Sequence, residues 1–369
     1  MTNKLSGRSL PVHLEFASYP SAAFRSGAYL FSVDRSAAAE TGPPFGEREV
    51  ADLVIVSGPV FAQVTVVWRV LGEGGVSTLA HTVRLQHTAG PQGEAIQLES
   101  LVDFGPPPNM RDTELVLRLR SGLATGRRFY TDKSGLGFIR REWREAAGLE
   151  GSMYPVTSAA FLQGNNTRVS LLVTHAMGAA SVEEGSMEVM LDRRTTYDDA
   201  RGMGEGVLDS RATMHRMWLL VEPRDPAAPT GPALPALSPL ATVLGRQQEH
   251  PVTALHATSP NTLGLRPSLG LLTSPLPCDC HLLNLRSWSP RRPGPRALLT
   301  LHRQAPDCAW ASLSLQDCQR PSSSPSLHFP SHATTLQPVS LTGNHPLERQ
   351  GDPLALQPIE LVAFNITFN

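Results

Sequence analysis

The chain has 369 residues, enough for two or three domains, and it combines 32 prolines and 30 glycines with only 18% charged residues. Its formal net charge of -1 offers no field that would attract nucleic acid or an anionic membrane, so we expect neither as a partner. No apolar run reaches the roughly 20 residues that a transmembrane helix needs, and residues 1–16 lack the apolar core of a signal peptide, so we expect no direct insertion into a membrane.

Short β-strands are predicted over most of the first two thirds of the chain, after an N-terminal connector at residues 1–25. The runs rich in β-branched and aromatic residues are 50–70 (two runs split by Ser57, Gly58 and Pro59), 77–86, 95–103, 113–120, 127–131, 136–141, 168–174, 187–193 and 212–222. Each is bounded by Gly, Pro, Asn or Asp, and no convincing helix lies between them. This pattern is typical of a β-sandwich, which we predict over residues 26–222.

The composition changes after Pro223. Residues 223–270 are rich in proline and predict a linker or loop. A smaller β domain is predicted over 271–369, and its strands are expected at 281–288, 296–303 and 356–368. A Pro/Ser-rich insertion that is hard to order interrupts it at 321–353.

One segment, Gly185–Gly206, combines a strand with a charged loop. Met187, Val189 and Leu191 alternate with Glu188, Met190 and Asp192, the period of a half-buried strand. Asp198, Asp199 and Arg201 then crowd together before Gly202, Gly204 and Gly206. Such a loop can present polar groups to a ligand, although composition alone favours a solvated loop whose charges pair with one another.

Five segments in order along the chain carry a resemblance to a known family. They are Ser26–Phe31 (SGAYLF), Phe129–Arg141 (FYTD, then GLGF and RR), Tyr154–Val156 (YPV), Asp192–Gly206 (DRR, then DDARG) and Pro277–Arg286 (PCD, then HLLNLR). Together they resemble segments of the class II α-mannosidases, glycoside hydrolase family 38, and the Golgi-type branch more than the lysosomal one. The resemblance is good over 26–222, patchy over 277–308 and weak beyond.

The resemblance implies a non-catalytic portion of such an enzyme. Members of the family are retaining glycosidases whose zinc ion, nucleophilic Asp and carboxylic acid lie in an N-terminal α/β domain opened by an H-x-D-P-G-W-type motif. That motif is absent here, so we expect no catalytic residue, metal ligand or cofactor in this chain, and zinc in the missing domain. Asp198 and Asp199 are adjacent and cannot flank one glycosidic bond. The expected fold class is all-β: a large antiparallel β-sandwich (a galactose-mutarotase-like supersandwich) followed by a smaller β domain.

The resemblance also implies two substrate-binding residues, Tyr29 and Arg201. They match the tyrosine of SGAYLF and the arginine of DDxRG, which reach the substrate cleft in the Golgi-type enzymes. A phenol and a guanidinium both donate hydrogen bonds to sugar hydroxyls. We expect Asp198 or Asp199 to support the Arg201 guanidinium, and both Tyr29 and Arg201 to lie exposed at one edge of the sandwich. Without the resemblance, Tyr29 is as well interpreted as a core aromatic and Arg201 as a salt-bridge partner.

The four cysteines lie in the last third of the chain. Cys308 and Cys318 are separated by a turn-prone segment that a disulfide across a hairpin could span, and the resemblance adds a similar DC…C pair in the Golgi-type enzymes. Cys278 and Cys280, with His281, form a weak metal-ligand set, because one intervening residue is too few for a zinc knuckle.

Two sequons could be glycosylated in a lumenal protein, at Asn165 and Asn365. They agree with the function that the resemblance implies: part of an α-mannosidase that removes terminal α-linked mannose during N-glycan processing in the Golgi lumen. Its partners would be N-glycan mannose residues and the missing catalytic domain, and the chain alone would be inactive. The alternatives are a non-catalytic β-sandwich that binds carbohydrate or a protein, and a lysosomal-type α-mannosidase.

Overall fold

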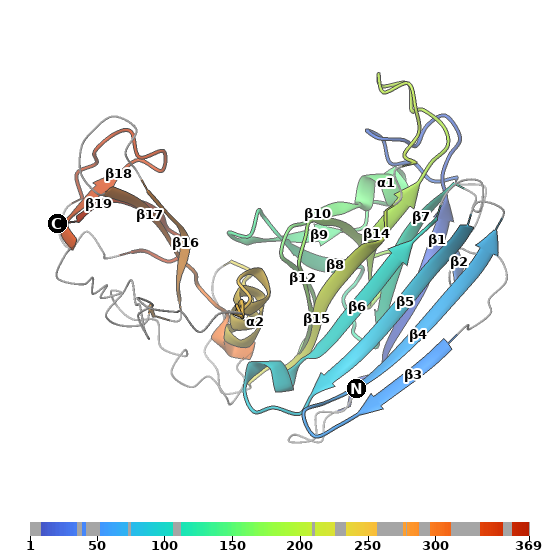
Figure 1. Ribbon diagram of the computed structural model, residues 1–369, viewed down its shortest axis with the longest axis horizontal. Coiled ribbons are helices and arrows are strands. Elements are labelled where there is room, and N and C mark those ends of the chain that lie inside the picture. The colour runs from blue at the N-terminus through green and yellow to red at the C-terminus, as the bar shows by residue number, and fades with distance from the viewer. Residues whose placement is uncertain are drawn as a thin grey trace. The chain divides into compact units, whose positions relative to one another are not determined.

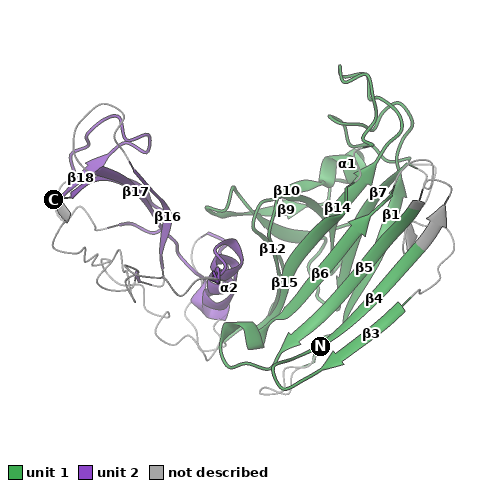
Figure 2. Ribbon diagram, in the orientation of Figure 1, with its two compact units in different colours: residues 1–228 green, residues 229–369 purple. Residues whose placement is uncertain are grey.

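The computed structural model describes residues 9–34, 39–41, 52–72, 75–105, 112–208, 211–225, 234–256, 276–277, 279–287, 296–310, 333–349 and 356–368. Two compact units divide the chain, Met1–Ala228 and Pro229–Asn369 (Figure 2). Cys278 and Cys318, both named above, lie outside the described residues.

Unit 1 contains a nine-stranded antiparallel sheet (Figure 1). In spatial order its strands are β3 (Asp52–Ser57), β4 (Phe61–Gly72), β5 (Gly75–Gln86), β6 (Ile96–Asp103), β15 (Thr213–Pro223), β12 (Thr167–Val173), β11 (Ala159–Gln163), β8 (Arg128–Asp132) and β9 (Phe138–Glu142). The hairpin between β8 and β9 closes where Gly135 takes a positive φ and its N–H donates to Asp132 Oδ2 at 2.7 Å. Most strands that are neighbours in this sheet are also consecutive along the chain.

A six-stranded antiparallel sheet faces it. Its strands in spatial order are β10 (Tyr154–Val156), β13 (Met177–Ala180), β14 (Ser186–Arg194), β7 (Thr113–Ser121), β1 (Val12–Pro20) and β2 (Glu40–Thr41). Only short helices accompany the two sheets in the described part of unit 1: α1 (Gly148–Ser152) and 3-10 turns at Pro91–Glu94 and Glu145–Ala147.

One apolar core joins the two sheets. Phe16, Leu117 and Val189 enter it from the six-stranded sheet, and Leu98 and Met217 enter it from the nine-stranded sheet. Two sheets that bury alternate side chains against each other form a sandwich. The predicted large antiparallel β-sandwich is confirmed.

The predicted N-terminal connector differs from the structure. Residues 12–20 form β1, which pairs with β7 along its whole length, from Val12 opposite Ser121 to Pro20 opposite Thr113. Phe16 and Ala17 are buried. The family-like motifs begin only at Ser26, so no motif marks the strand that precedes them.

Unit 2 holds a smaller sheet, as predicted. Its four strands, in spatial order, are β16 (Cys280–Ser287), β17 (Arg296–Arg303), β19 (Leu361–Phe368) and β18 (Ala333–Val339). Leu299, Leu301, Phe364 and Ile366 form the centre of its core. The strand β18 lies within the stretch predicted as a Pro/Ser-rich insertion.

A helix, α2 (Pro239–Glu249), lies where a linker was predicted. Ser238 caps it, because its side-chain oxygen accepts from the N–H of Ala241 at 3.0 Å, and Pro239 stands at the first helical position. A 3-10 turn at Cys308–Trp310 follows β17. Among the described residues, no helix has both the length and the apolar character needed to cross a membrane.

Candidate functional site

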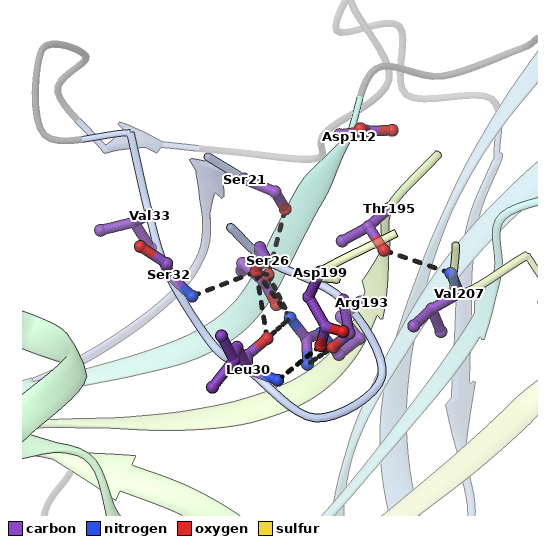
Figure 3. Close-up of polar contacts among 12 residues, drawn as sticks. Ser21, Ser26, Leu30, Ser32, Val33, Asp112, Arg193, Thr195, Asp199 and Val207 are labelled. Carbon is purple, nitrogen blue, oxygen red and sulfur yellow. Dashed lines mark hydrogen bonds and ion pairs between the residues drawn. The ribbon is translucent and has the colours of Figure 1, made fainter. Parts of the chain in front are cut away.

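The charged loop after β14 is closed at its base. Thr195 and Val207 form an isolated antiparallel bridge, and the Val207 N–H also donates to Thr195 Oγ1 at 3.2 Å (Figure 3). Thr196 is tied to Asp112, which accepts from its N–H and its hydroxyl, both at 2.8 Å. The loop therefore starts and ends at one fixed point at the end of β14.

Arg193, near the end of β14, binds the segment that begins at Ser26. Its Nη2 donates to Ser26 Oγ at 2.7 Å and to the Leu30 carbonyl at 3.0 Å, and its Nη1 donates to the Gly27 carbonyl at 2.8 Å (Figure 3). These acceptors are the inward-facing groups of one tight turn. One guanidinium thus holds the whole SGAYLF turn against the sheet.

Glu114 on β7 binds both Arg193 and the turn that Arg193 holds. It stands opposite Arg193 in the strand register and accepts from Arg193 Nη2 at 2.8 Å, from Ser26 Oγ at 2.8 Å and from Ser21 Oγ at 3.0 Å. The side chain is fully buried. Burial raises the pKa of the Glu114 carboxyl above its ordinary value, although Arg193 and the two serine hydroxyls act in the opposite direction.

Asp199 fixes the same turn from the loop side. Its Oδ2 accepts from the N–H groups of Tyr29 at 2.8 Å and Leu30 at 2.9 Å, and its Oδ1 accepts from the N–H of Arg201 at 3.2 Å. Burial acts to raise the pKa of Asp199, but these three backbone donors and the Arg201 charge outweigh it and hold the pKa below its usual range. A carboxylate that accepts three N–H groups joins two segments 170 positions apart in the sequence.

Tyr29 and Arg201 therefore lie in neighbouring segments at one edge of the sandwich. Tyr29 is 64% exposed, and Arg201 is also exposed. Both positions agree with the expectation from the sequence, in which the two segments are neighbours and both side chains lie exposed. Their role in substrate binding stays a prediction.

The comparison with protein families shows which family the chain belongs to. The model of the "Glycosyl hydrolases family 38 C-terminal domain" matches residues 1–201, more than half of the chain. The chain belongs to glycoside hydrolase family 38. The matched range contains both of the joined segments, SGAYLF and DDAR.

Curated relatives are α-mannosidases. The chain is 40% identical over 218 residues to "Alpha-mannosidase 2" of Spodoptera frugiperda, covering 57% of this chain and 19% of that protein. It is 30% identical over 360 residues to "Alpha-mannosidase 2x" of Mus musculus, covering 93% of this chain and 30% of that protein. "Alpha-mannosidase 2" of Arabidopsis thaliana is 34% identical over 77% of this chain and 25% of its own length. The family 38 chain thus spans less than a third of these relatives.

A solved structure supports the fold. An α-mannosidase from Enterococcus faecalis V583 superposes with a TM-score of 0.63 at 13% identity, covering 99% of this chain and 39% of that one. At this identity the likeness shows the fold alone.

The two aspartates interact with their surroundings differently from what the sequence predicts. We expected one of them to hold the Arg201 guanidinium, but among the described residues no ion pair joins that guanidinium to Asp198 or Asp199. Asp199 instead binds the backbone of the turn, and Asp198 Oδ1 is buried without a hydrogen-bond partner in the described part of the chain. The guanidinium of Arg201 is left exposed.

Sequence reasoning missed three residues that organise the site: Ser26, Glu114 and Arg193. Two of them lie inside the motifs quoted for the resemblance, SGAYLF and DRR, and this was the available signal. Glu114 is the one acidic residue of β7 and directly precedes the apolar residues Leu115, Val116 and Leu117, so a buried carboxylate that needs a partner is indicated there.

An exposed aromatic pair also lies at this edge. The rings of Phe24 and Tyr197 are in contact, with centroids 4.4 Å apart and planes inclined at 47°, and the two residues are 69% and 40% exposed. Phe24 precedes the turn and Tyr197 belongs to the charged loop, so the pair adds an apolar surface beside Tyr29 and Arg201. No pattern in the sequence joined these two rings.

The remaining predicted sites stay predictions. Cys308 forms no disulfide with another described residue, and its expected partner Cys318 lies outside the described part of the chain. Asn165 is exposed in the turn between β11 and β12. Asn365 lies in β19 between β17 and β18, with its Oδ1 buried.

Proposed function

We propose that this chain is the C-terminal β region of an α-mannosidase that hydrolyses terminal α-linked mannose during N-glycan processing, and that Tyr29 and Arg201 line its substrate cleft. The observation that carries the proposal is the carboxylate of Asp199, which ties the Tyr29 turn to the Arg201 loop. Names of the relatives, all α-mannosidases, support the reaction.

The proposed role of the two side chains follows from their donors. The Tyr29 hydroxyl donates to a sugar hydroxyl or to a carboxylate of the catalytic domain, and the Arg201 guanidinium offers several N–H groups to hydroxyls or bridging waters. Both are presented on backbone that Asp199 and Arg193 hold in place. A preorganised donor loses less conformational entropy when it meets the sugar.

The nucleophile, the acid and a zinc ion would belong to the catalytic domain of the same enzyme, as in the family that the motifs resemble. We place this enzyme in the lumen of the Golgi. The relatives named "Alpha-mannosidase 2" and the exposed sequon at Asn165 support that location.

The test uses the full-length enzyme that contains this chain. Arg201→Ala should lower kcat/KM for an oligomannose substrate by about 1–3 kcal/mol, or roughly 5- to 150-fold, because a charged hydrogen bond is lost. Tyr29→Phe removes one hydroxyl and should cost less. Neither substitution should lower the free energy of unfolding, since both side chains are exposed.

Arg140→Ala is the matched control, because Arg140 is another exposed arginine of unit 1, paired with Glu142. It should leave kcat/KM unchanged. Equal kcat/KM values for Arg201→Ala and Arg140→Ala would refute the cleft role. If the chain instead belongs to a sugar-binding protein without mannosidase activity, the full-length protein should bind mannose but should not hydrolyse the substrate.

A further inference from the structure

Three metal-binding side chains meet in unit 2, at the end of α2. Glu249 is the last residue of that helix and His250 is its C-cap, and His281 lies on β16. Their ligand atoms, one carboxylate oxygen and two ring nitrogens, all lie within 4.8 Å of one another. The two imidazole rings are 5.7 Å apart between centroids and inclined at 59°. Three ligands from two elements therefore converge on one point.

The helix end explains how neighbouring residues reach the same point as β16. The N–H of His250 bonds to the Arg246 carbonyl at 2.8 Å, so the last turn of α2 is intact up to this residue. The φ of His250 is -125°, and the chain leaves the helical path there. Glu249 and His250 are both exposed, so an ion can reach them from solvent.

A second observation marks the same place. His281 stands opposite His302 in the register of β16 and β17, so their side chains share one face of the sheet. His281 Nε2 and both ring nitrogens of the buried His302 have no hydrogen-bond partner among the described residues. Three such orphaned nitrogens on adjacent strands call for a partner that protein atoms do not supply.

We propose that Glu249, His250 and His281 bind a divalent transition-metal ion, zinc or one of similar ligand preference. Two imidazoles and a carboxylate form a common three-residue set for zinc, with water in the fourth position. The site differs from the set considered from the sequence, Cys278, Cys280 and His281, and it departs from the expectation that this chain binds no metal. It is independent of the mannosidase proposal.

Arg246 limits the affinity of this site. Burial lowers the pKa of His281, and the positive charge of Arg246 lowers it further. Burial also lowers the pKa of Arg246, and the negative charge of Glu249 acts in turn to raise it. A fixed cation near the ligands opposes a second one. A bound ion would nevertheless join the end of α2 to β16, and this link would stabilise unit 2.

Metal binding is tested on the full 369-residue chain after removal of metals with a chelator. Calorimetric titration with zinc chloride at pH 7.5 should show one ion per chain, and Co²⁺, used as a spectroscopic probe, should give visible bands of a nitrogen- and oxygen-ligated site. His250→Ala and His281→Ala should each weaken binding roughly tenfold or more, and Glu249→Gln should weaken it as well. Zinc should also raise the midpoint of thermal unfolding.

His345→Ala is the matched control, because His345 is an exposed histidine of the same unit. It should bind zinc as the unsubstituted chain does. Because Glu249 and His250 are exposed, their variants remain informative even if His281→Ala fails to fold. The proposal is overturned if zinc shows no saturable binding, or if binding persists unchanged in both His250→Ala and Glu249→Gln.

Discussion

The chemistry of the candidate site depends on Gly27 as much as on any charged residue. A Cβ atom added to Gly27 would lie 2.8 Å from Asp199 Cβ, 2.9 Å from its Cγ and 3.0 Å from its backbone nitrogen. The absence of a side chain at this position is what lets Asp199 come close enough to accept from Tyr29 and Leu30. The close packing of the two segments thus explains a glycine that does not need a positive φ.

Gly27→Ala should therefore weaken the joint between the turn and the loop. Because Asp199 is fixed by three hydrogen bonds and cannot move aside freely, we expect the free energy of unfolding to fall by about 1–3 kcal/mol, as for overpacking elsewhere. Denaturant unfolding of the purified chain measures it. Gly137→Ala is the control, since a Cβ there meets nothing within 4 Å. Equal stability of the two variants would contradict the close approach.

At this scale the sequence predicts which residues meet, but not how they meet. The motifs brought Tyr29, Asp199 and Arg201 together correctly, through resemblance. Charge pairing between neighbours predicts that Asp199 binds the Arg201 guanidinium. The structure shows that it binds three converging backbone N–H groups instead, because these partly buried donors would otherwise lose their partners. Those donors belong to a distant segment that no local pattern reveals.

At the scale of elements, β14 shows why a strand can be predicted while its faces are not. The alternation of Met187 and Val189 with Glu188 indicates a strand with one face in solvent, but Glu188 is buried too. Arg118 lies between Glu188 and Glu15 in the register of β14, β7 and β1, and it donates to both at 2.5 and 3.2 Å.

Tyr19 adds to this row of charges across the outer face of the sheet, since its hydroxyl donates to Glu188 Oε2 at 2.7 Å. Burial raises the pKa of Glu188, and Arg118 and Tyr19 oppose that rise without cancelling it. An apolar cluster that includes Val33, Leu149 and Ala180 packs beside the row. The sheet is therefore covered on both faces here. The alternation of apolar and polar residues, which predicts one buried face and one face in solvent, does not describe it.

Arg118→Met should be strongly destabilising, because it leaves Glu188 buried without a cation. We expect a loss of about 3–5 kcal/mol in the free energy of unfolding, partly recovered by the second substitution Glu188→Gln. The exposed pair Arg140–Glu142 provides the control, and Arg140→Met should cost less than about 1 kcal/mol. Unfolding of the three variants and of the unsubstituted chain in guanidinium chloride distinguishes them. A loss from Arg118→Met as small as that from Arg140→Met would show that the row contributes nothing to stability.

The helix α2 is an element that the sequence analysis does not predict. Residues 223–270 are predicted as a linker or loop because of their many prolines, yet Ser238 followed by Pro239 is a recognisable start of a helix. The capping residues indicate a helix, but the proline-rich stretch before them indicates a linker. The strands are predicted more reliably because turn residues bound each of them on both sides.

At the scale of the whole molecule, the two units divide the functions proposed for the chain. Unit 1 carries the edge with Tyr29 and Arg201, and unit 2 carries the cluster of Glu249, His250 and His281. The all-β class and the large sandwich followed from strand periodicity alone, whereas the reaction followed only from motif resemblance. The histidine cluster followed from neither, because its ligands come from a helix that was not predicted and from a strand 31 positions away, counting from His250 to His281.

The purified 369-residue chain should not hydrolyse an aryl α-mannoside. A retaining glycosidase needs two carboxyl groups about 5 Å apart, one protonated and one ionised. Asp198 and Asp199 are the carboxylates nearest to Arg201 in the sequence, and Asp199 is occupied by three backbone donors that hold its pKa low. Release of the aryl alcohol, compared with a buffer blank and with a full-length α-mannosidase 2 as positive control, measures the activity. Turnover by the chain that is lost in Arg201→Ala would mean that a complete catalytic pair lies within these residues, and the assignment of catalysis to another domain would then be wrong.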